Sequence, residues 1–125
     1  MPAVTPAYAA LLGLIFILLS VRVIIARRRG RIAFGSGGDA DLERRIRIQA
    51  NFAEYVPFAL LLLFFAEQGG ASPGALHVLC GALLAGRIAH AIGLSHVRWD
   101  DLGRIAGMTG TQVAILGAVV LILMR

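Results

Sequence analysis

Polar residues recur along one side of a predicted helix in the middle of the chain. Arg47, Asn51, Glu54 and Phe58 follow one another at spacings of three or four residues, so at about 100° per residue they share one helical face. Gln49 points nearly the opposite way, toward a different neighbour. Guanidinium, amide and carboxylate groups on one face can bind the carboxylate, amide and ammonium groups of a small zwitterionic or anionic ligand.

A structural interpretation of Glu54 competes with this binding site. Glu54 is followed by twelve uncharged residues, which places its carboxylate at the boundary of a membrane's hydrocarbon core, where an ionised group needs a partner. An ion pair with an arginine of a neighbouring helix would satisfy it equally well. The residues themselves leave both interpretations open.

Other polar groups near the same predicted depth are further candidates. Arg27 and Arg28 end the first apolar segment, Arg87 and His90 are three residues apart late in the third, and Arg104 begins the fourth. On physical grounds Arg87 is expected to extend to the interface from a helix end. His90 either has its hydrogen-bond partners at a helix interface or contacts a ligand. Arg104 is by default a signal for the orientation of the helices in the membrane.

The elements that must position these groups are membrane helices. The 125 residues are 58% hydrophobic and 15% charged, with a mean hydropathy of +0.81, whereas soluble domains carry about 25% charged residues. Four apolar segments, at about 6–26, 40–66, 73–94 and 101–124, are each long enough to cross a hydrocarbon core of about 30 Å. We therefore predict one domain, residues 1–125, folded as an all-α integral membrane four-helix bundle.

Local signals mark the ends of these helices. Asp39 or Asp41 can cap the second helix, after a glycine-rich connector that ends the first. Ser72 and Pro73 fit the cap and first residue of the third helix. Pro57 removes one backbone hydrogen bond inside the second helix and is expected to bend it.

The charge pattern predicts the orientation in the membrane. All twelve cations are arginines, and they flank the apolar segments as topology signals do, which excludes a nucleic-acid partner. Seven of them lie in or beside the first loop, while Arg98 and Arg104 lie in the third loop region near Trp99, which is expected at interfacial depth. We expect both of these loops in the cytoplasm and both termini outside, in a multi-pass protein of a bacterial inner membrane.

Three weaker features complete the pattern. Small residues recur at spacings of four and three in the last segment, which permits close helix packing; they are Gly103, Gly107, Gly110, Ala114 and Gly117. The single cysteine, Cys80, excludes a disulfide framework and a cysteine metal site and is expected to be a small buried hydrophobe. His77 has no evident partner, so no role is assigned to it, and no metal site is predicted.

The second helix resembles the signature of a known family. The pattern Arg47-x-Gln49-x-Asn51-x-x-Glu54-Tyr55-x-Pro57 looks like the second-helix motif of the MAPEG family, the membrane-associated proteins in eicosanoid and glutathione metabolism. Six fixed residue types match within one eleven-residue window. Four spans, a basic first loop and Arg87 extend the resemblance over essentially the whole chain, and the GSGG loop before Asp-Leu-Glu-Arg resembles the small bacterial branch.

The resemblance implies a homotrimer in the lipid bilayer, with glutathione as co-substrate bound between subunits near the cytoplasmic face. It implies that Arg104 is the catalytic residue and stabilises the glutathione thiolate. The thiolate then attacks a lipophilic electrophile. It implies glutathione-binding roles for the other matching positions: Arg27 or Arg28, Arg47, Gln49, Asn51, Glu54, Tyr55 and Arg87, with His90 beside them. The resemblance thus implies a membrane glutathione transferase or peroxidase.

Two alternatives to this activity remain. Catalytic family members carry tyrosines where this chain has His90 and Leu94, and other members only bind lipid, so a non-catalytic protein that binds lipid or glutathione is the second hypothesis. A small multidrug exporter has similar size and span number. That class depends on an acidic residue within its first helix, and the first segment here contains none.

Overall fold

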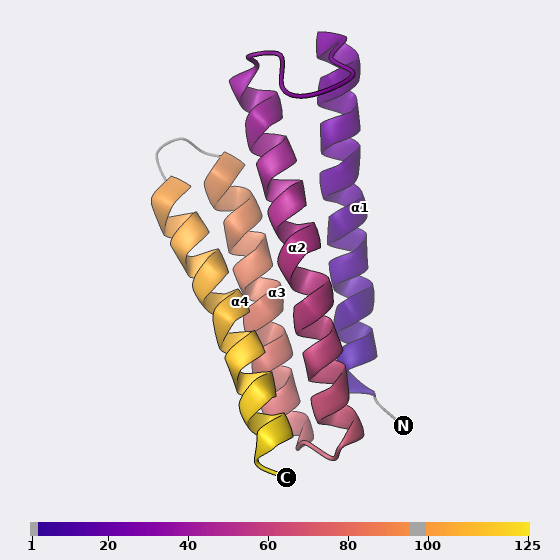
Figure 1. Ribbon diagram of the computed structural model, residues 1–125, viewed down its shortest axis with the longest axis vertical. Helices are drawn as coiled ribbons and strands as arrows, with labels where there is room; N and C mark the ends of the chain where they lie inside the picture. Colours follow the sequence, from indigo (N-terminus) through magenta and orange to yellow (C-terminus); the bar gives the residue numbers. More distant parts are fainter. Residues whose placement is uncertain (1–2, 96–99) are drawn as a thin grey trace.

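The protein is a bundle of long antiparallel helices (Figure 1). The computed structural model describes residues 3–95 and 100–125, with the side chains of 3–92 and 102–125. Within them the helices are α1 (Val4–Gly30), α2 (Ala40–Gln68), α3 (Pro73–Ser95) and α4 (Asp100–Leu123). All four are long and apolar enough to cross a membrane, which confirms the predicted all-α, four-span architecture. Both termini lie at one end of the bundle, and α1 and α2 extend beyond α3 and α4 at the other (Figure 1).

The first helix is longer than its apolar segment. It continues through Arg27, Arg28 and Arg29 to Gly30, because cations in the last turn interact favourably with the negative end of the helix dipole. Arg31, with φ of 52°, caps it in the left-handed conformation, and its N–H bonds the carbonyl of Arg28 at 3.4 Å. The helix thus ends before the glycine-rich connector, not within it.

The predicted caps of α2 and α3 are confirmed. The Asp39 carboxylate accepts hydrogen bonds from the N–H groups of Asp41 and Leu42, at 2.9 and 3.1 Å. The Ser72 hydroxyl accepts one from the N–H of Ala75 at 3.3 Å. The second helix continues through Pro57 to Gln68.

Small residues bring α3 and α4 into close contact, as the spacing in the last segment predicts. A Cβ atom added to Gly110 would lie 2.7 Å from the carbonyl oxygen of Ala82, and one added to Gly107 would lie 2.4 Å from the Cβ of His90. Ala114 is fully buried in the same contact. The backbones of the two helices therefore approach too closely for larger side chains at these positions.

Side chains also tie helix ends together at the end of the bundle that carries the termini. The Glu67 carboxylate, near the end of α2, accepts hydrogen bonds from the N–H groups of Ala3, Val4 and Thr5 at 2.7, 2.7 and 2.8 Å. These are first-turn amides of α1 and of the residue before it, which have no partner within the helix. Arg125 donates to the carbonyl of Phe65 at 3.2 Å, near the end of α2.

Apolar side chains form both the core and the outer surface. The core includes Leu12, Ile48, Leu63 and Leu83, together with the predicted buried thiol Cys80. Large apolar side chains are also exposed on the outside of every helix, as a membrane protein requires because its outer surface meets lipid; on α1 they include Leu11, Leu14, Ile17, Leu18 and Val21.

Candidate functional site

A polar cavity lies where α2, α3 and α4 meet, in the half of the bundle that is remote from the chain termini. It has a volume of about 190 Å³ and is lined by Glu43, Arg44, Arg47, Asn51, His90 and Arg104. Four of these six were predicted from the sequence as site residues: Arg47, Asn51, His90 and Arg104. Residues from three separate segments of the chain thus converge on one cavity.

The helical repeat of α2 explains how one helix supplies most of the lining. Glu43, Arg47 and Asn51 succeed one another at intervals of four residues, so they lie on one face, and Arg44 lies three residues before Arg47. Three guanidinium groups and one carboxylate surround the cavity. The cavity therefore has excess positive charge, and its donors suit carboxylate groups.

Arg87 is buried beneath this region, and the prediction that it extends to the interface is wrong. Its side chain is 1% exposed. Its guanidinium carbon lies 5.5 Å from the ring centroid of Phe52 on α2, within the range of a cation–π interaction. The Nη1 atom is 3.5 Å from the Thr111 hydroxyl, and Nη2 is 3.5 Å from Nδ1 of His90. The side chain packs inward because an aromatic face and two polar atoms are available inside the bundle.

The buried arginine is incompletely satisfied. Its Nε atom has no hydrogen-bond partner, and the two Nη contacts are at the long limit for hydrogen bonds. A buried charge with weak contacts is costly, and intramembrane charges are commonly functional. The positive charge of Arg87 lies next to the cavity, because its Nη2 atom contacts His90, one of the residues that line it.

Thr111 is part of this arrangement and sequence reasoning missed it. Its side chain is fully buried, and its hydroxyl donates a hydrogen bond to the carbonyl of Gly107 at 2.9 Å. That bond directs an oxygen lone pair toward Arg87. The signal was present, since Thr111 follows Gly107 by one helical turn on the face of α4 that was predicted to pack closely.

Three predicted binding residues lie away from the polar cavity. Arg27 donates from Nη1 to the carbonyls of Ile32 and Gly35, at 3.3 and 2.8 Å, and so holds the first connector. Arg28 is exposed at the end of α1. Gln49 faces α1, as its angular position predicts, and its Nε2 donates to the Ser20 hydroxyl at 2.9 Å.

Glu54 and Tyr55 lie one turn beyond the cavity along α2. Glu54 is exposed and Tyr55 half-buried. Within the described part of the chain Glu54 forms no ion pair, and the salt bridge found there joins Arg45 to Asp41 at 2.9 Å. The predicted ion pair between Glu54 and an arginine of another helix is therefore not made within one copy of the described chain.

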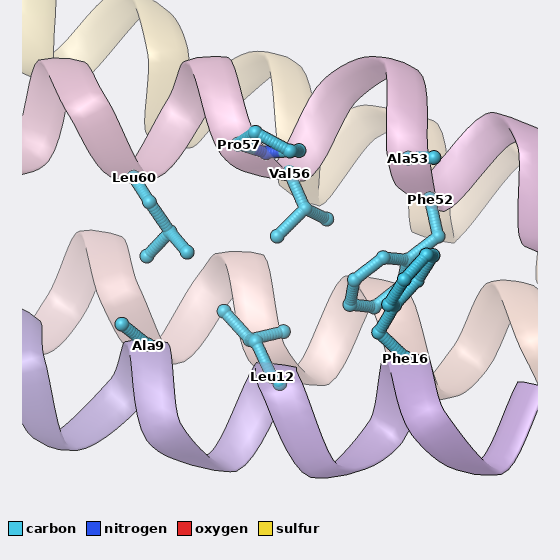
Figure 2. A pocket seen from close by; sticks show the side chains of 9 residues that line it. Ala9, Leu12, Phe16, Phe52, Ala53, Val56, Pro57 and Leu60 are labelled. Carbon is cyan, nitrogen blue, oxygen red and sulfur yellow. The ribbon is translucent and has the colours of Figure 1, made fainter.

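An apolar groove lies between α1 and α2. It has a volume of about 270 Å³, and Figure 2 shows Val56 and Leu60 of α2 pointing toward α1, with the rings of Phe16 and Phe52 against each other. The two ring centroids are 5.6 Å apart. Phe52 therefore contacts this groove and the Arg87 guanidinium at the same time.

His77 contacts a residue of the first helix. His77 was assigned no partner, but its Nδ1 lies 3.2 Å from the hydroxyl of Tyr8 on α1, so that expectation is wrong. The two residues are brought together by packing of α1 on α3, which no local pattern reveals. The predicted interfacial position of Trp99 and the topological role of Arg98 lie outside the described residues.

Comparison with known proteins agrees with the motif in α2. The model of the MAPEG family matches residues 5–124. The "Inner membrane protein YecN" of Escherichia coli strain K12 is 38% identical over 115 residues, which cover 90% of this chain and 85% of the relative. The protein of the same name from Escherichia coli O6:H1 matches with the same identity and coverage. With four membrane-spanning helices, these matches confirm the predicted localisation, a multi-pass inner membrane protein.

Proposed function

This chain belongs to the MAPEG family, and from that premise we propose that it binds glutathione in the polar cavity and activates the thiolate. The second substrate is a lipophilic electrophile dissolved in the membrane. The protein acts as a homotrimer, with the cavity at the cytoplasmic side and both termini outside. The reaction class is that of a glutathione transferase or peroxidase.

The observation that carries the proposal is the composition of the cavity lining. Glutathione has two carboxylates, one ammonium group, two amides and a thiol. Arg44 and Arg47 suit the carboxylates, Glu43 suits the ammonium group, and Asn51 suits an amide, because charge-assisted pairs of this kind are the strong ones. Each charged group of the tripeptide thus has an opposite charge in the lining.

Arg104 has the chemistry to activate the thiol. An ordinary thiol has a pKa of about 8.5, so little of it is ionised at neutral pH, and a neighbouring guanidinium favours the anion. Arginine keeps its charge in a partly buried site. In a transferase reaction with an aryl chloride, the thiolate forms a carbon–sulfur bond, chloride leaves, and the thiol proton passes to solvent.

The size of the cavity supports a site shared between subunits. Ligand pockets usually enclose about 300–1,000 Å³, and this cavity encloses about 190 Å³. Arg47 in its lining is exposed, and Glu54 is exposed one turn further along α2. A second copy of the chain would complete the wall and provide polar partners for both side chains, as the homotrimer requires.

A non-catalytic protein of the same family is the second candidate, favoured by one specific observation. The position of a family tyrosine is held by His90, which is 2% exposed and lies against Arg87. Such a site would bind glutathione or a lipid without turnover. In this case glutathione would raise the thermal stability of the protein by linkage, while no conjugate forms.

Conjugation of glutathione to a nitro-activated aryl chloride tests the proposed function. Purified trimer in detergent should form the thioether, and Arg104→Ala should reduce the rate by about tenfold, the effect of one pKa unit on the thiolate fraction. Arg29→Ala is the matched control, since Arg29 is exposed and lies outside the cavity. Equal rates for the wild type and Arg104→Ala, with the trimer intact, would refute thiolate activation by Arg104. Thermal stabilisation by glutathione without product would favour the second candidate.

A further inference from the structure

A second groove, separate from the polar cavity, lies between α1 and α3. It has a volume of about 260 Å³, and its walls are apolar except for one charged side chain, Arg22; the other lining residues are Ile15, Leu18, Leu19, Ile88, Ala91 and Ile92. Leu18, Ile88 and Ile92 are 60%, 44% and 57% exposed. The groove therefore faces the surroundings of the bundle and combines an apolar wall with a single guanidinium.

The Arg22 guanidinium belongs to the part of the groove that is nearest the C-terminal end of α1. Along α1, Ile15, Leu18 and Leu19 precede Arg22 by one to two turns toward the middle of the span. The main chain at Arg22 is level with the first half of α2, because its carbonyl accepts a hydrogen bond from Nη1 of Arg45 at 3.1 Å. The charge thus lies near the polar headgroups while the apolar wall extends toward the centre of the bilayer.

More positive charge follows on the same side of the helix. Arg29 comes seven residues after Arg22, which is almost two full turns, so the two share one face of α1. Arg29 is exposed and contributes to a small polar hollow with Asp39, Asp41 and Arg45. A headgroup near Arg22 would therefore lie close to a surface on which arginines outnumber acidic residues when Arg31 is included.

We propose that this groove holds one acyl chain of a phospholipid with a net anionic headgroup, with its phosphate at Arg22. The apolar wall recognises the chain, the guanidinium pairs with the phosphate, and the neighbouring arginines favour a headgroup with net negative charge. One guanidinium at the end of an apolar wall matches the headgroup and chain of a single lipid more closely than the apolar outer face of a transmembrane helix of a second copy. This lipid site is independent of the glutathione cavity.

Photo-crosslinking in nanodiscs tests the proposal. The probes are phosphatidylglycerol and phosphatidylcholine that carry the same diazirine-labelled acyl chain. Cross-links to phosphatidylglycerol should map to residues 15–22 and 88–92 and exceed those to phosphatidylcholine. Arg22→Gln should lower this preference about fivefold, which corresponds to about 1 kcal/mol for one arginine near the surface. Arg28→Gln, an equal change of charge on an exposed arginine outside the groove, should alter it much less.

A second pair of variants tests the groove itself without changing any charge. Leu18 and Ile17 are both 60% exposed, but only Leu18 lines the groove. Leu18→Trp should fill it and abolish cross-links between α1 and α3 for both lipids, whereas Ile17→Trp should leave them unchanged. Equal labelling of both tryptophan variants, or an Arg22→Gln protein with unchanged lipid preference, overturns the proposal. Loss of the oligomer in Leu18→Trp, measured by native mass spectrometry, would assign the groove to a second copy and also overturn it.

Discussion

Arg87 of α3 lies over the ring of Phe52 of α2, with 5.5 Å between the guanidinium carbon and the ring centroid. The ring of Phe52 also stacks on Phe16 of α1, with 5.6 Å between ring centroids. One aromatic side chain thus links three helices and contacts a buried charge. We expect this ring to help hold Arg87 behind the polar cavity.

Replacement of Phe52 by leucine should destabilise the bundle. The variant loses a cation–π contact and an aromatic pair, and the expected loss of unfolding free energy is about 1–2 kcal/mol. Titration with a denaturing detergent in mixed micelles measures it. Phe58→Leu is the matched control, because Phe58 is on the same helix but 55% exposed. Equal loss in both variants would show that the contact with Arg87 contributes nothing.

Replacement of Thr111 by valine keeps the shape of the side chain but removes the oxygen near Arg87. We expect a loss of unfolding free energy of about 1–3 kcal/mol, because a buried donor is left unsatisfied. The same change at Thr109, which is exposed on α4, should have little effect. If Arg87 also contributes to glutathione binding, Thr111→Val should weaken the thermal stabilisation that glutathione provides. If glutathione stabilises the variant as much as the wild type, Thr111 does not contribute to glutathione binding.

Alanine at two glycines should have opposite effects. At Gly110 the new Cβ would lie 2.7 Å from the carbonyl oxygen of Ala82, so α3 and α4 must separate, and we expect a loss of about 1–3 kcal/mol, as for overpacking in general. At Gly13, in α1, nothing lies within 4 Å of the new Cβ, and alanine should stabilise the helix by up to about 1 kcal/mol. Thermal unfolding of both variants in one detergent checks the signs. A stabilised Gly110→Ala protein would contradict the close contact.

Removal of the Glu67 carboxylate should weaken the start of α1. Glu67→Ala leaves the N–H groups of Ala3, Val4 and Thr5 without their acceptor, and loss of a cap costs about 0.5–2 kcal/mol. Amide hydrogen exchange should become faster in the first turn of α1. The adjacent exposed residue offers a control, Gln68→Ala. Unchanged exchange at Val4 and Thr5 in Glu67→Ala would refute this cap.

The sequence predicted those features that follow from local physics. Hydropathy located four spans, Asp39 and Ser72 were identified as caps by residue type and position, and the periodic glycines indicated the face of α4 that packs on α3. Helical angles likewise placed Arg47 and Asn51 on one face and Gln49 on another. These features need only the geometry of a single helix.

The features that local patterns could not predict depend on which helices are neighbours. The inward packing of Arg87 requires Phe52 and Thr111, which lie 35 and 24 residues away in the chain. The partner of His77 is Tyr8, 69 residues away. A snorkelling arginine and a buried one have the same sequence context at a helix end, so only tertiary packing decides between them. The participation of Glu43 in the cavity could have been inferred, because it is one turn before Arg47.

The Glu67 cap has a consequence for the order in which the chain is assembled. The three amides that it accepts from are 62 to 64 residues earlier in the chain. During synthesis the first turn of α1 therefore remains incomplete until the whole of α2 has been made and has crossed back beside it. The start of α1 and the end of α2 are thus completed by the same carboxylate, which closes the open end of the hairpin that the two helices form.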